Sequence, residues 1–545
     1  MFYKSNWNGA WQDAGFFECA QISVQQHRMD DASEEIENCL IRNTHNHKAR
    51  ALKAVILRLT DKKDEAIAWC EESLKIDQFN YGCLFELFLS TDNKKYLDKM
   101  VEMMHGMPNN YDELALDYAG AGLYGEALKV LQVAIDNKAI TPMTYYYLGW
   151  VLRKKDTDDW EIAESAYEQA SKYPSDYCFP NRPEAVLALK DAMRMNEKDA
   201  KAPYYLGCLY YDKRQYDVAM EVWRESAEID PKFPTVWRNL ALGLFNKEHK
   251  DEEAVKYMEK AFQLDASDAR ILMELDQLYK RLGYDHAMRL SHLQQYPELI
   301  AKRDDLLLEE ITLLNQTGQY EEAMKKLDAH QFHPWEGGEG KVSGQYQLSR
   351  QELAKKALVA KDYDKAIQLL EECLVYPHHL GEGKLYGAQE NDFYYFLGCA
   401  YAAKGMADKA NDCWEEATKG PQEPAAAMYY NDAKPDKIFY QGLALLKLGR
   451  VDEAHGRFYK LVNYGKNHLF DEVVMDYFAV SLPDLQIWEG DLNVSNRIHC
   501  KYMLALGFYG LGDKKHAERY LDEASRLDKN HLGILSFKSM IELEL

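Results

Sequence analysis

The stretch that decides the fold is Tyr204-Tyr-Leu-Gly-Cys-Leu-Tyr-Tyr-Asp-Lys-Arg-Gln-Tyr-Asp-Val-Ala219. Large apolar residues stand three or four positions apart on both sides of the polar run 212–215, which is the spacing of one face of an α-helix. Small residues such as Gly207 and Ala219 let two antiparallel helices approach closely. The stretch therefore predicts two helices joined by a tight turn.

The same pattern returns along the chain. Leu240 follows Leu206 by 34 positions, and Tyr394-Tyr-Phe-Leu-Gly-Cys-Ala-Tyr401 repeats the Leu-Gly pair. One such unit cannot bury its apolar face alone, so units must stack. The pattern resembles the tetratricopeptide repeat. The small residue of the second helix recurs at Ala66, Ala127, Ala219, Ala254, Ala323, Ala366, Ala410, Ala454 and Ala517.

We therefore predict an all-α, right-handed superhelical solenoid of about thirteen tetratricopeptide-like hairpins. Residues 1–300 should form an array of regular and degenerate repeats, with an atypical unit at 171–200. Residues 301–545 should form an array with inserted loops. The chain begins without the polar capping unit that solenoid ends normally carry, which suggests a fragment of a longer protein.

Composition excludes several classes of protein. The formal net charge of the 545 residues is −23, and no basic stripe is present to bind a nucleic-acid backbone. No apolar run approaches the roughly 18 residues of a membrane span, and the start of the chain does not resemble a signal peptide. The ten cysteines include no Cys-x-x-Cys pair. We predict reduced cysteines, a cytoplasmic location, and neither nucleic-acid nor membrane partners.

The repeat period lengthens in the second half of the chain. Successive central alanines from Ala323 to Ala454 are 43, 44 and 44 positions apart, and Ala517 follows after 63. The additional residues all fall between the second helix of one unit and the first helix of the next. They should therefore lie on one edge of the solenoid. We predict that loops 332–345, 376–388 and 425–435 contact one another and enclose a pocket.

The first insert contains His333-Pro-Trp-Glu-Gly-Gly-Glu-Gly340, and its Gly338-Glu-Gly-Lys341 returns as Gly381-Glu-Gly-Lys384. Glycine there permits a positive φ and a close approach of the backbone to a ligand. The alternative is that both tetrapeptides are helix C-caps with a lysine near the last carbonyls. The candidate ligand-binding residues of the inserts are His333, Trp335, Gly337, Gly338, Lys341, Glu382, Lys384, Tyr430 and Asn431.

A second set of candidates follows from the helices. In this repeat type, the position two before the Leu-small pair points into the concave groove. Tyr204, Arg238 and Tyr395 occupy it. Aromatic rings with neighbouring carboxylates suit sugars, whose C–H faces stack while their hydroxyls find acceptors, and they also suit a peptide. Core packing is the alternative for these side chains.

Other chemistry is sparse. The sequence lacks the phosphate-binding, nucleophile-elbow, zinc-protease and dinucleotide motifs, and we predict no cofactor. Glu336 and Glu339 are the candidate catalytic carboxylates, since glycoside chemistry uses two carboxyl groups roughly 5–10 Å apart. His333, His378 and His379 could meet across adjacent loops, but histidine more often acts as a hydrogen-bonding side chain. We therefore predict no metal site.

Several segments together resemble a family of large bacterial proteins that join a galactose-mutarotase-like β-sandwich domain to a long tetratricopeptide array. The segments are WNGAWQDAG (7–15), DYCFPNR (176–182), WRNL (237–240), FHPWEGGEGKV (332–342) and FAVSLP (478–483). The resemblance covers nearly the whole chain but only the helical half of the family. It implies a bacterial, carbohydrate-associated protein whose β-sandwich domain is absent from this chain. It transfers no catalytic residue.

The favoured function is a binding or interaction module. Its concave face and C-terminal loops would bind a glycan, a peptide or a partner domain, including the absent β-sandwich. The alternative is that the loops supply the carboxylates of a glycoside-processing enzyme. A plain structural spacer is a third reading, in which the repeated tetrapeptide is an accident.

Overall fold

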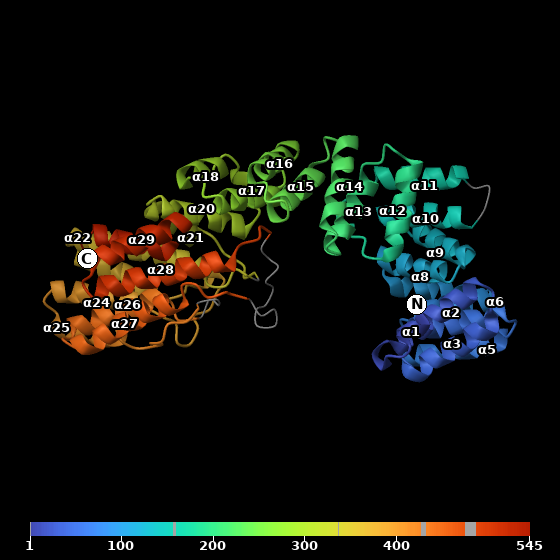
Figure 1. The fold of residues 1–545 in the computed structure, drawn as a ribbon, viewed down its shortest axis with the longest axis horizontal. Helices are drawn as coiled ribbons and strands as arrows, with labels where there is room; N and C mark the ends of the chain where they lie inside the picture. Colours follow the sequence, from blue (N-terminus) through green and yellow to red (C-terminus); the bar gives the residue numbers. More distant parts are fainter. Residues whose placement is uncertain (1, 156–159, 336, 427–431, 475–486, 545) are drawn as a thin grey trace. The chain divides into compact units, whose positions relative to one another are not determined.

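The computed structural model describes residues 2–155, 160–335, 337–426, 432–474 and 487–544. Within these ranges the chain is helical and contains no β-strand, which confirms the predicted all-α class. Consecutive helices pair into antiparallel hairpins (Figure 1), and the described residues form thirteen of them by the order of the helices. The chain divides into two compact units, Met1–Val236 and Trp237–Leu545, with the boundary inside α15 (Pro234–Asn246). The division predicted at residue 300 concerns repeat regularity and stays a prediction.

Unit 1 contains six hairpins and one single helix, α12 (Pro183–Met195), which lies in the segment predicted to be atypical. The short helices α1 (Phe2–Ser5) and η1 (Gly9–Trp11) precede them. The hairpins are α2 (Gln12–Gln25) with α3 (Met29–Arg42), α4 (His47–Leu59) with α5 (Lys63–Ile76), α6 (Tyr81–Thr91) with α7 (Lys94–Met104), α8 (Pro108–Gly120) with α9 (Tyr124–Asp136), α10 (Pro142–Lys154) with α11 (Trp160–Lys172), and α13 (Lys201–Asp212) with α14 (Tyr216–Ile229).

Unit 2 continues the repeat and ends on a single helix, α30 (Leu532–Glu542). Two short helices, α19 (Pro297–Ile300) and η2 (His378–Leu380), lie between hairpins. The hairpins are α15 with α16 (Asp251–Leu264), α17 (Ala269–Arg281) with α18 (His286–Leu293), α20 (Asp304–Gln316) with α21 (Tyr320–Ala329), α22 (Lys341–Val359) with α23 (Tyr363–Cys373), α24 (Asn391–Ala403) with α25 (Ala407–Ala417), α26 (Pro435–Lys447) with α27 (Val451–His468), and α28 (Leu492–Gly510) with α29 (Lys514–Leu527).

One hydrogen bond recurs in equivalent hairpins. The indole N–H of Trp223 donates to the backbone carbonyl of Tyr204 at 3.1 Å, and Trp414 donates to Tyr395 at 3.3 Å. In both hairpins a glycine three residues after the acceptor makes room for the indole. A Cβ on Gly207 would lie 2.3 Å from Trp223. This contact is the close helix approach that the Leu-Gly pair predicts.

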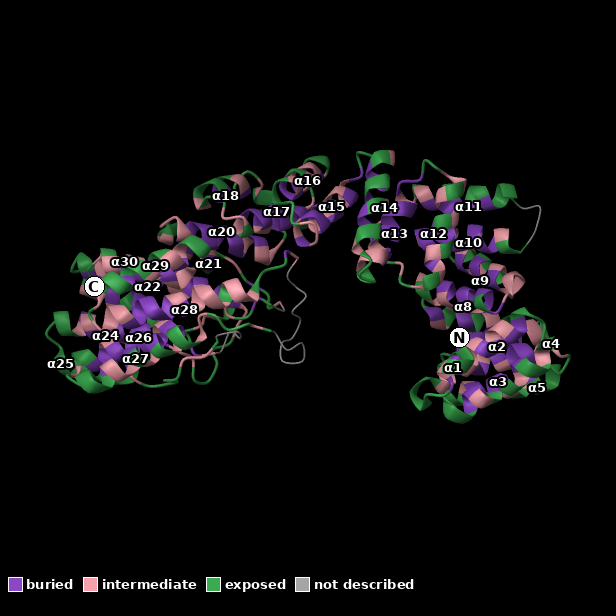
Figure 2. Cartoon of the chain, viewed as in Figure 1, coloured by how far each residue is buried: buried purple, intermediate pink, exposed green. Residues whose placement is uncertain are grey.

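The small residues of the second helices are buried in every hairpin that the pattern marked. The nine central alanines are at most 2% exposed, and Figure 2 shows the buried residues between packed helices while turns and outer faces are exposed. Seven of the ten cysteines are buried thiols, among them Cys19, Cys39 and Cys373. Among the described residues, no helix is both long enough and apolar enough to cross a membrane.

Two late segments of unit 2 return to its early hairpins. The indole N–H of Trp488 donates to the carbonyl of Glu274 in α17 at 2.8 Å, and its ring meets Phe245 edge-on at 5.3 Å. Further along, α30 packs against α22, where Lys355 Nζ donates to Ser536 Oγ at 2.8 Å. In Figure 1 the red C-terminal helices accordingly lie beside α20–α22. These contacts enclose the space in which the candidate site lies.

Candidate functional site

The first two inserted loops contact each other, as predicted. The backbone N–H of Phe332 donates to the carbonyl of His379 at 2.8 Å. Gly381 lies so close to this stretch of chain that a Cβ there would stand 2.6 Å from the carbonyl oxygen of Phe332. Because Gly381 has a φ of +71°, glycine is favoured there for its conformation as well as its size.

Glu382 links the second loop to the helix that begins in the first loop. One of its oxygens accepts hydrogen bonds from the Gly340 N–H at 3.1 Å and from the Ser343 hydroxyl at 2.8 Å. Gly340 is the N-cap residue of α22, so this carboxylate satisfies a free donor of that helix terminus and lies at the positive end of its dipole. Glu382 therefore fixes the start of α22 from a different loop.

The two Gly-Glu-Gly-Lys tetrapeptides end up in different surroundings. The first leads into a helix, with Lys341 as the first residue of α22. The second follows a 3-10 turn, and its Lys384 donates to the Leu374 carbonyl at 2.8 Å and pairs with Glu390 at 2.6 Å. Lys384 thus binds a carbonyl just beyond the end of α23. This arrangement resembles the alternative prediction, in which the lysine lies near the last carbonyls of a helix. Lys341 faces a cavity instead.

The histidines of the loops have separate acidic partners. His333 and His330 both lie within hydrogen-bonding distance of Asp304, at 3.1 Å and 2.8 Å, while His379 lies 3.8 Å from Asp328. Burial would raise the pKa of Asp304, but the His333 backbone N–H and the two imidazoles outweigh it and lower that pKa. Among the described residues, no group of three metal-ligating side chains is close enough to hold an ion.

The third loop contacts the residue directly after the second loop through two hydrogen bonds. The side-chain amide of Gln389, directly after the second loop, donates to the Asp432 carbonyl at 3.0 Å and accepts from the Lys434 N–H at 3.1 Å. The predicted site residues Glu336, Tyr430 and Asn431 lie outside the described residues.

Unit 2 contains a large cavity of about 930 Å³, which is lined by residues of the first and third inserted loops but by no described residue of the second loop, 376–388. The predicted pocket enclosed by all three loops stays a prediction. The first helices of six hairpins line the cavity, together with the first loop, α30 and the segment before α30. Trp335, Gly337 and Lys341 are the predicted residues on its wall. Other lining side chains are Arg270, Glu274, Gln277, Lys280, Arg303, Asp305, Glu309, Gln316, Gln345, Gln347, Gln351, Asp392, Lys434, Lys437, His499, Asn530, His531 and Ser536.

Most charges on this wall are paired. Arg238 clamps Glu274 with two bonds of 2.6 Å, and Lys437 pairs with Asp392. Burial alone would lower the pKa of Lys437, but the carboxylates of Asp392 and Asp436 outweigh it and raise that pKa. The cavity wall is therefore a rigid framework of satisfied ion pairs.

Several polar groups on the wall have no protein partner among the described residues. Gln316 Oε1 is buried without a donor. Lys341 and Lys434 are exposed lysines whose ammonium groups make no hydrogen bond or ion pair within the described residues. Protein around each ammonium lowers its pKa by desolvation, and neighbouring Lys280 and Lys437 lower it further for Lys341 and Lys434 respectively. These groups are available to a ligand.

A smaller cavity of about 430 Å³ lies on the other side of Trp335. His333, Gly338, Glu339 and Glu382 line it together with that ring. The indole lies directly on Gly338, where a Cβ would stand 2.4 Å from it. Five predicted residues of the first two loops therefore meet at one place, with Trp335 shared by both cavities.

The candidate ligand-binding residues on the helices are packed against other side chains rather than exposed to a ligand. Tyr204 is 9% exposed and meets Phe233 at 4.8 Å, and Tyr395 is 6% exposed and meets Tyr440 at 5.6 Å. Arg238 is held by Glu274. These positions follow the core-packing alternative, because the first helices of neighbouring repeats lie close enough to cover them.

The sequence pattern did not point to Asn530, Ser536, Lys434 or Gln316. Asn530 lies beside Arg289 although 241 positions separate them, and no local period relates such residues. The sequence feature that could have identified Lys434 is its position in the third insert.

Comparison with known proteins agrees with the architecture. A tetratricopeptide repeat is recognised at residues 47–80, which include α4 and α5. The fold is a tetratricopeptide-like solenoid. Similar solved structures include MamA (41 to the end) of Desulfovibrio magneticus, 19% identical over 36% of this chain and 97% of its own, with a TM-score of 0.22.

Two others are a thermophilic TPR protein of Thermus thermophilus and Naa15/Naa10 bound to HypK-THB. The first is 18% identical over 43% of this chain and 98% of its own, with a TM-score of 0.18. The second is 13% identical over 98% of this chain and 96% of its own, with a TM-score of 0.23.

Proposed function

We propose that unit 2 binds a hydroxyl-rich ligand, a glycan, in the large cavity beside Trp335. The observation that carries the proposal is the meeting of one indole ring with a buried, unsatisfied Gln316 oxygen and two exposed lysines that have no protein partner among the described residues, on a single cavity wall. A sugar hydroxyl both donates and accepts, so it matches the Gln316 acceptor and the Lys341 and Lys434 donors together. The apolar face of a sugar ring suits the indole.

The size of the cavity supports a small ligand. Its volume of about 930 Å³ falls within the roughly 300–1,000 Å³ of small-molecule pockets. The concave face of unit 2 already holds α30, which packs on α22. A long extended peptide would compete with that helix, whereas a short glycan would not.

A thermal-shift titration with neutral, amino and acidic mono- and oligosaccharides tests the proposal. A ligand at 100 times its Kd should stabilise the wild-type chain by about 2.7 kcal/mol. Trp335→Ala should weaken that ligand at least tenfold. Gly338→Ala should also weaken it, because the added methyl group would displace the ring.

Trp7→Ala is the matched control, since Trp7 is 85% exposed and belongs to unit 1. If no glycan stabilises the wild type, the proposal is wrong, and a galactose-mutarotase-like β-sandwich domain, which the family resemblance implies as a partner, becomes the first protein to add. Product analysis in the same samples tests the enzyme alternative with Glu336 and Glu339, which stays a prediction.

A second candidate concerns unit 1, whose helices α4, α6 and α8 line a groove of about 190 Å³. Its floor is apolar, with Ala51, Leu52 and Leu114, and the Lys48–Asp117 ion pair of 2.7 Å lies on its wall. This combination suits a peptide with apolar side chains.

A random-peptide display screen on the full chain tests this second function. Phe79 lines the groove and is 50% exposed, so Phe79→Ala should weaken selected peptides at least tenfold. A screen that selects no peptide, or peptides indifferent to this change, would contradict it.

A further inference from the structure

The last described helix of unit 2 is held differently from the hairpins. The segment 528–542, called the tail here, consists of a turn and α30, and α30 has no hairpin partner among the described residues. It lies against the first helices α22, α26 and α28. Most of its polar contacts reach residues 181 to 250 positions earlier in the chain, while the Gly533 carbonyl accepts from the nearer Tyr502 hydroxyl. Because α29 already pairs with α28, the tail could leave without breaking a hairpin.

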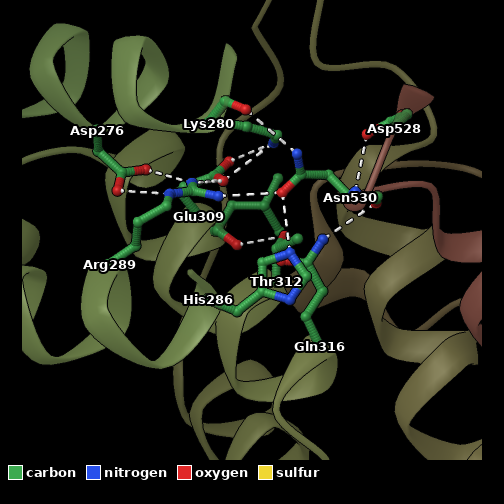
Figure 3. Close-up of polar contacts among 10 residues, drawn as sticks. Asp276, Lys280, His286, Arg289, Glu309, Thr312, Gln316, Asp528 and Asn530 are labelled. Carbon is green, nitrogen blue, oxygen red and sulfur yellow. Dashed lines mark hydrogen bonds and ion pairs between the residues drawn. The ribbon is translucent and has the colours of Figure 1, made fainter. Parts of the chain in front are cut away.

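Asn530 is the first anchor of the tail (Figure 3). Its Oδ1 accepts from Arg289 at 3.2 Å and lies 3.0 Å from His286 Nε2, and its Nδ2 donates to the Lys280 carbonyl at 3.3 Å. Its own carbonyl accepts from Gln316 at 3.1 Å. One side chain and its peptide group are therefore matched by donors and acceptors from three helices.

A buried ionic network holds those groups in place. Arg289 is fully buried, bonds Asp276 at 2.6 Å and reaches Glu309 at 2.7 Å, while Lys280 bonds Glu309 at 3.0 Å. Burial would raise the pKa of Glu309, but Lys280 and Arg289 outweigh it and lower that pKa. The network presents a fixed Arg289 donor to Asn530.

The second anchor is a pair of serines one turn apart. Ser536 and Ser539 donate to the two oxygens of Glu352 at 2.6 Å and 2.7 Å. Lys355, fully buried beside Glu352, donates to the Ser536 hydroxyl at 2.8 Å and to its carbonyl at 3.0 Å. The buried pair on α22 is thus completed by the tail.

The opposite face of α30 is apolar. Ile534, Phe537 and Met540 are at most 3% exposed. The Phe537 ring meets Phe439 at 5.4 Å edge-on, and the Tyr440 hydroxyl lies 3.6 Å from the Met540 sulfur. Spacing of three residues places the three apolar side chains on one face of the helix.

We infer that the concave face of unit 2 is a binding site for an amphipathic helix, with the tail as its resident ligand. The partner that fits is a helix preceded by an asparagine turn. Relative to the asparagine, it carries apolar side chains at positions +4, +7 and +10 and hydroxyls at +6 and +9, as residues 530–540 do. A partner helix of this pattern enters only when the tail leaves. The inference does not depend on glycan binding.

The test uses the full chain and a fluorescein-labelled peptide of residues 526–545. In the wild type the site is occupied, so the peptide should bind weakly. In the triple variant Asn530→Ala, Ser536→Ala, Ser539→Ala, the resident tail competes poorly and the peptide should bind at least tenfold more tightly. The same peptide carrying the three alanines should bind neither chain.

Lys538→Ala is the matched control, because Lys538 lies on α30 but makes no hydrogen bond or ion pair within the described chain. Its peptide affinity should equal that of the wild type. Hydrogen exchange provides a second readout: amides of α30 should exchange at least tenfold faster in the triple variant, while those of α13 in unit 1 should not change. Equal peptide binding by wild type and triple variant, or a triple variant that loses its helix content as a whole, would overturn the inference.

Discussion

At the scale of single residues, the hairpins depend on a glycine that lies under an aromatic ring. Gly207 and Gly398 each face an indole whose N–H reaches a carbonyl of the opposite helix. Gly442 faces Phe458 in the same way, without a polar bond. The ring fills the space that the missing side chain leaves, so the two residue types are needed together.

A pair of glycine substitutions in unit 1 separates packing from helix propensity. Gly207→Ala should lower the free energy of unfolding by about 1–3 kcal/mol, because its methyl group would overlap Trp223. Gly125→Ala in α9 has open space around it and should raise stability by up to about 1 kcal/mol. Urea unfolding of both variants checks this, and equal effects would show that the overlap is relieved at no cost.

Asp112 predicts a pH dependence of unit 1. It is buried, and burial raises its pKa to about 7 despite a 3.1 Å hydrogen bond from Thr144. Its folded pKa lies above its ordinary value of 3.8, so the folded state binds the additional proton. Stability should therefore fall as the pH rises from about 4 to about 7, by roughly 4 kcal/mol at most.

Asp112→Asn should remove most of this slope and make unit 1 more stable than the wild type at pH 8 but not at pH 4. Hydrogen exchange of α8 at both pH values measures the difference. Asp98→Asn, at an exposed site on α7, should keep the wild-type slope. An unchanged slope in the Asp112 variant would contradict the assignment.

At the scale of elements, α22 begins at a contact between two loops. Glu382→Ala should remove the acceptor of Gly340 and Ser343 and destabilise the first turn by about 1 kcal/mol. Amides of the first turn of α22 should then exchange roughly fivefold faster. Glu339→Ala, which removes an exposed carboxylate of the first loop directly before α22, is the control and should change nothing. Equal exchange in the two variants would show that water replaces Glu382.

The elements were predictable because their signals are local. The Leu-Gly pair and the buried alanine lie within 13 residues, as Leu206 and Ala219 do, and they predict a hairpin wherever it occurs. The contact between the first two loops was predictable too, because insertions at the same position of consecutive repeats lie on the same edge of a solenoid. The orientation of Tyr395 was not predictable, because the distance between neighbouring first helices determines whether its ring is exposed in the groove or packed in the core. The site of Asn530 was not, because the curvature of several repeats brings it to Arg289.

At the scale of the whole molecule, unit 2 is the unit in which, within the described residues, late segments of the chain contact the early hairpins. Outside the tail, Trp488 is the largest buried side chain in these contacts, and it is 2% exposed. Trp488→Ala should cost unit 2 about 3–5 kcal/mol through the lost ring and the lost bond to the Glu274 carbonyl. Thermal unfolding checks this. Trp7→Ala should change stability by less than about 0.5 kcal/mol, and equal effects of the two variants would contradict the role of Trp488.

The long return of the tail also has a consequence during protein synthesis. Ser539 follows its partner Glu352 by 187 residues. At roughly 5–20 residues per second, a ribosome needs about 10–40 s to cover that distance. Throughout this interval the early helices of unit 2 have emerged, while Arg289, Glu352 and Lys355 lack the segment that completes their bonds. Each newly made chain therefore passes through a period in which a nascent-chain chaperone or a neighbouring polypeptide can reach this surface first.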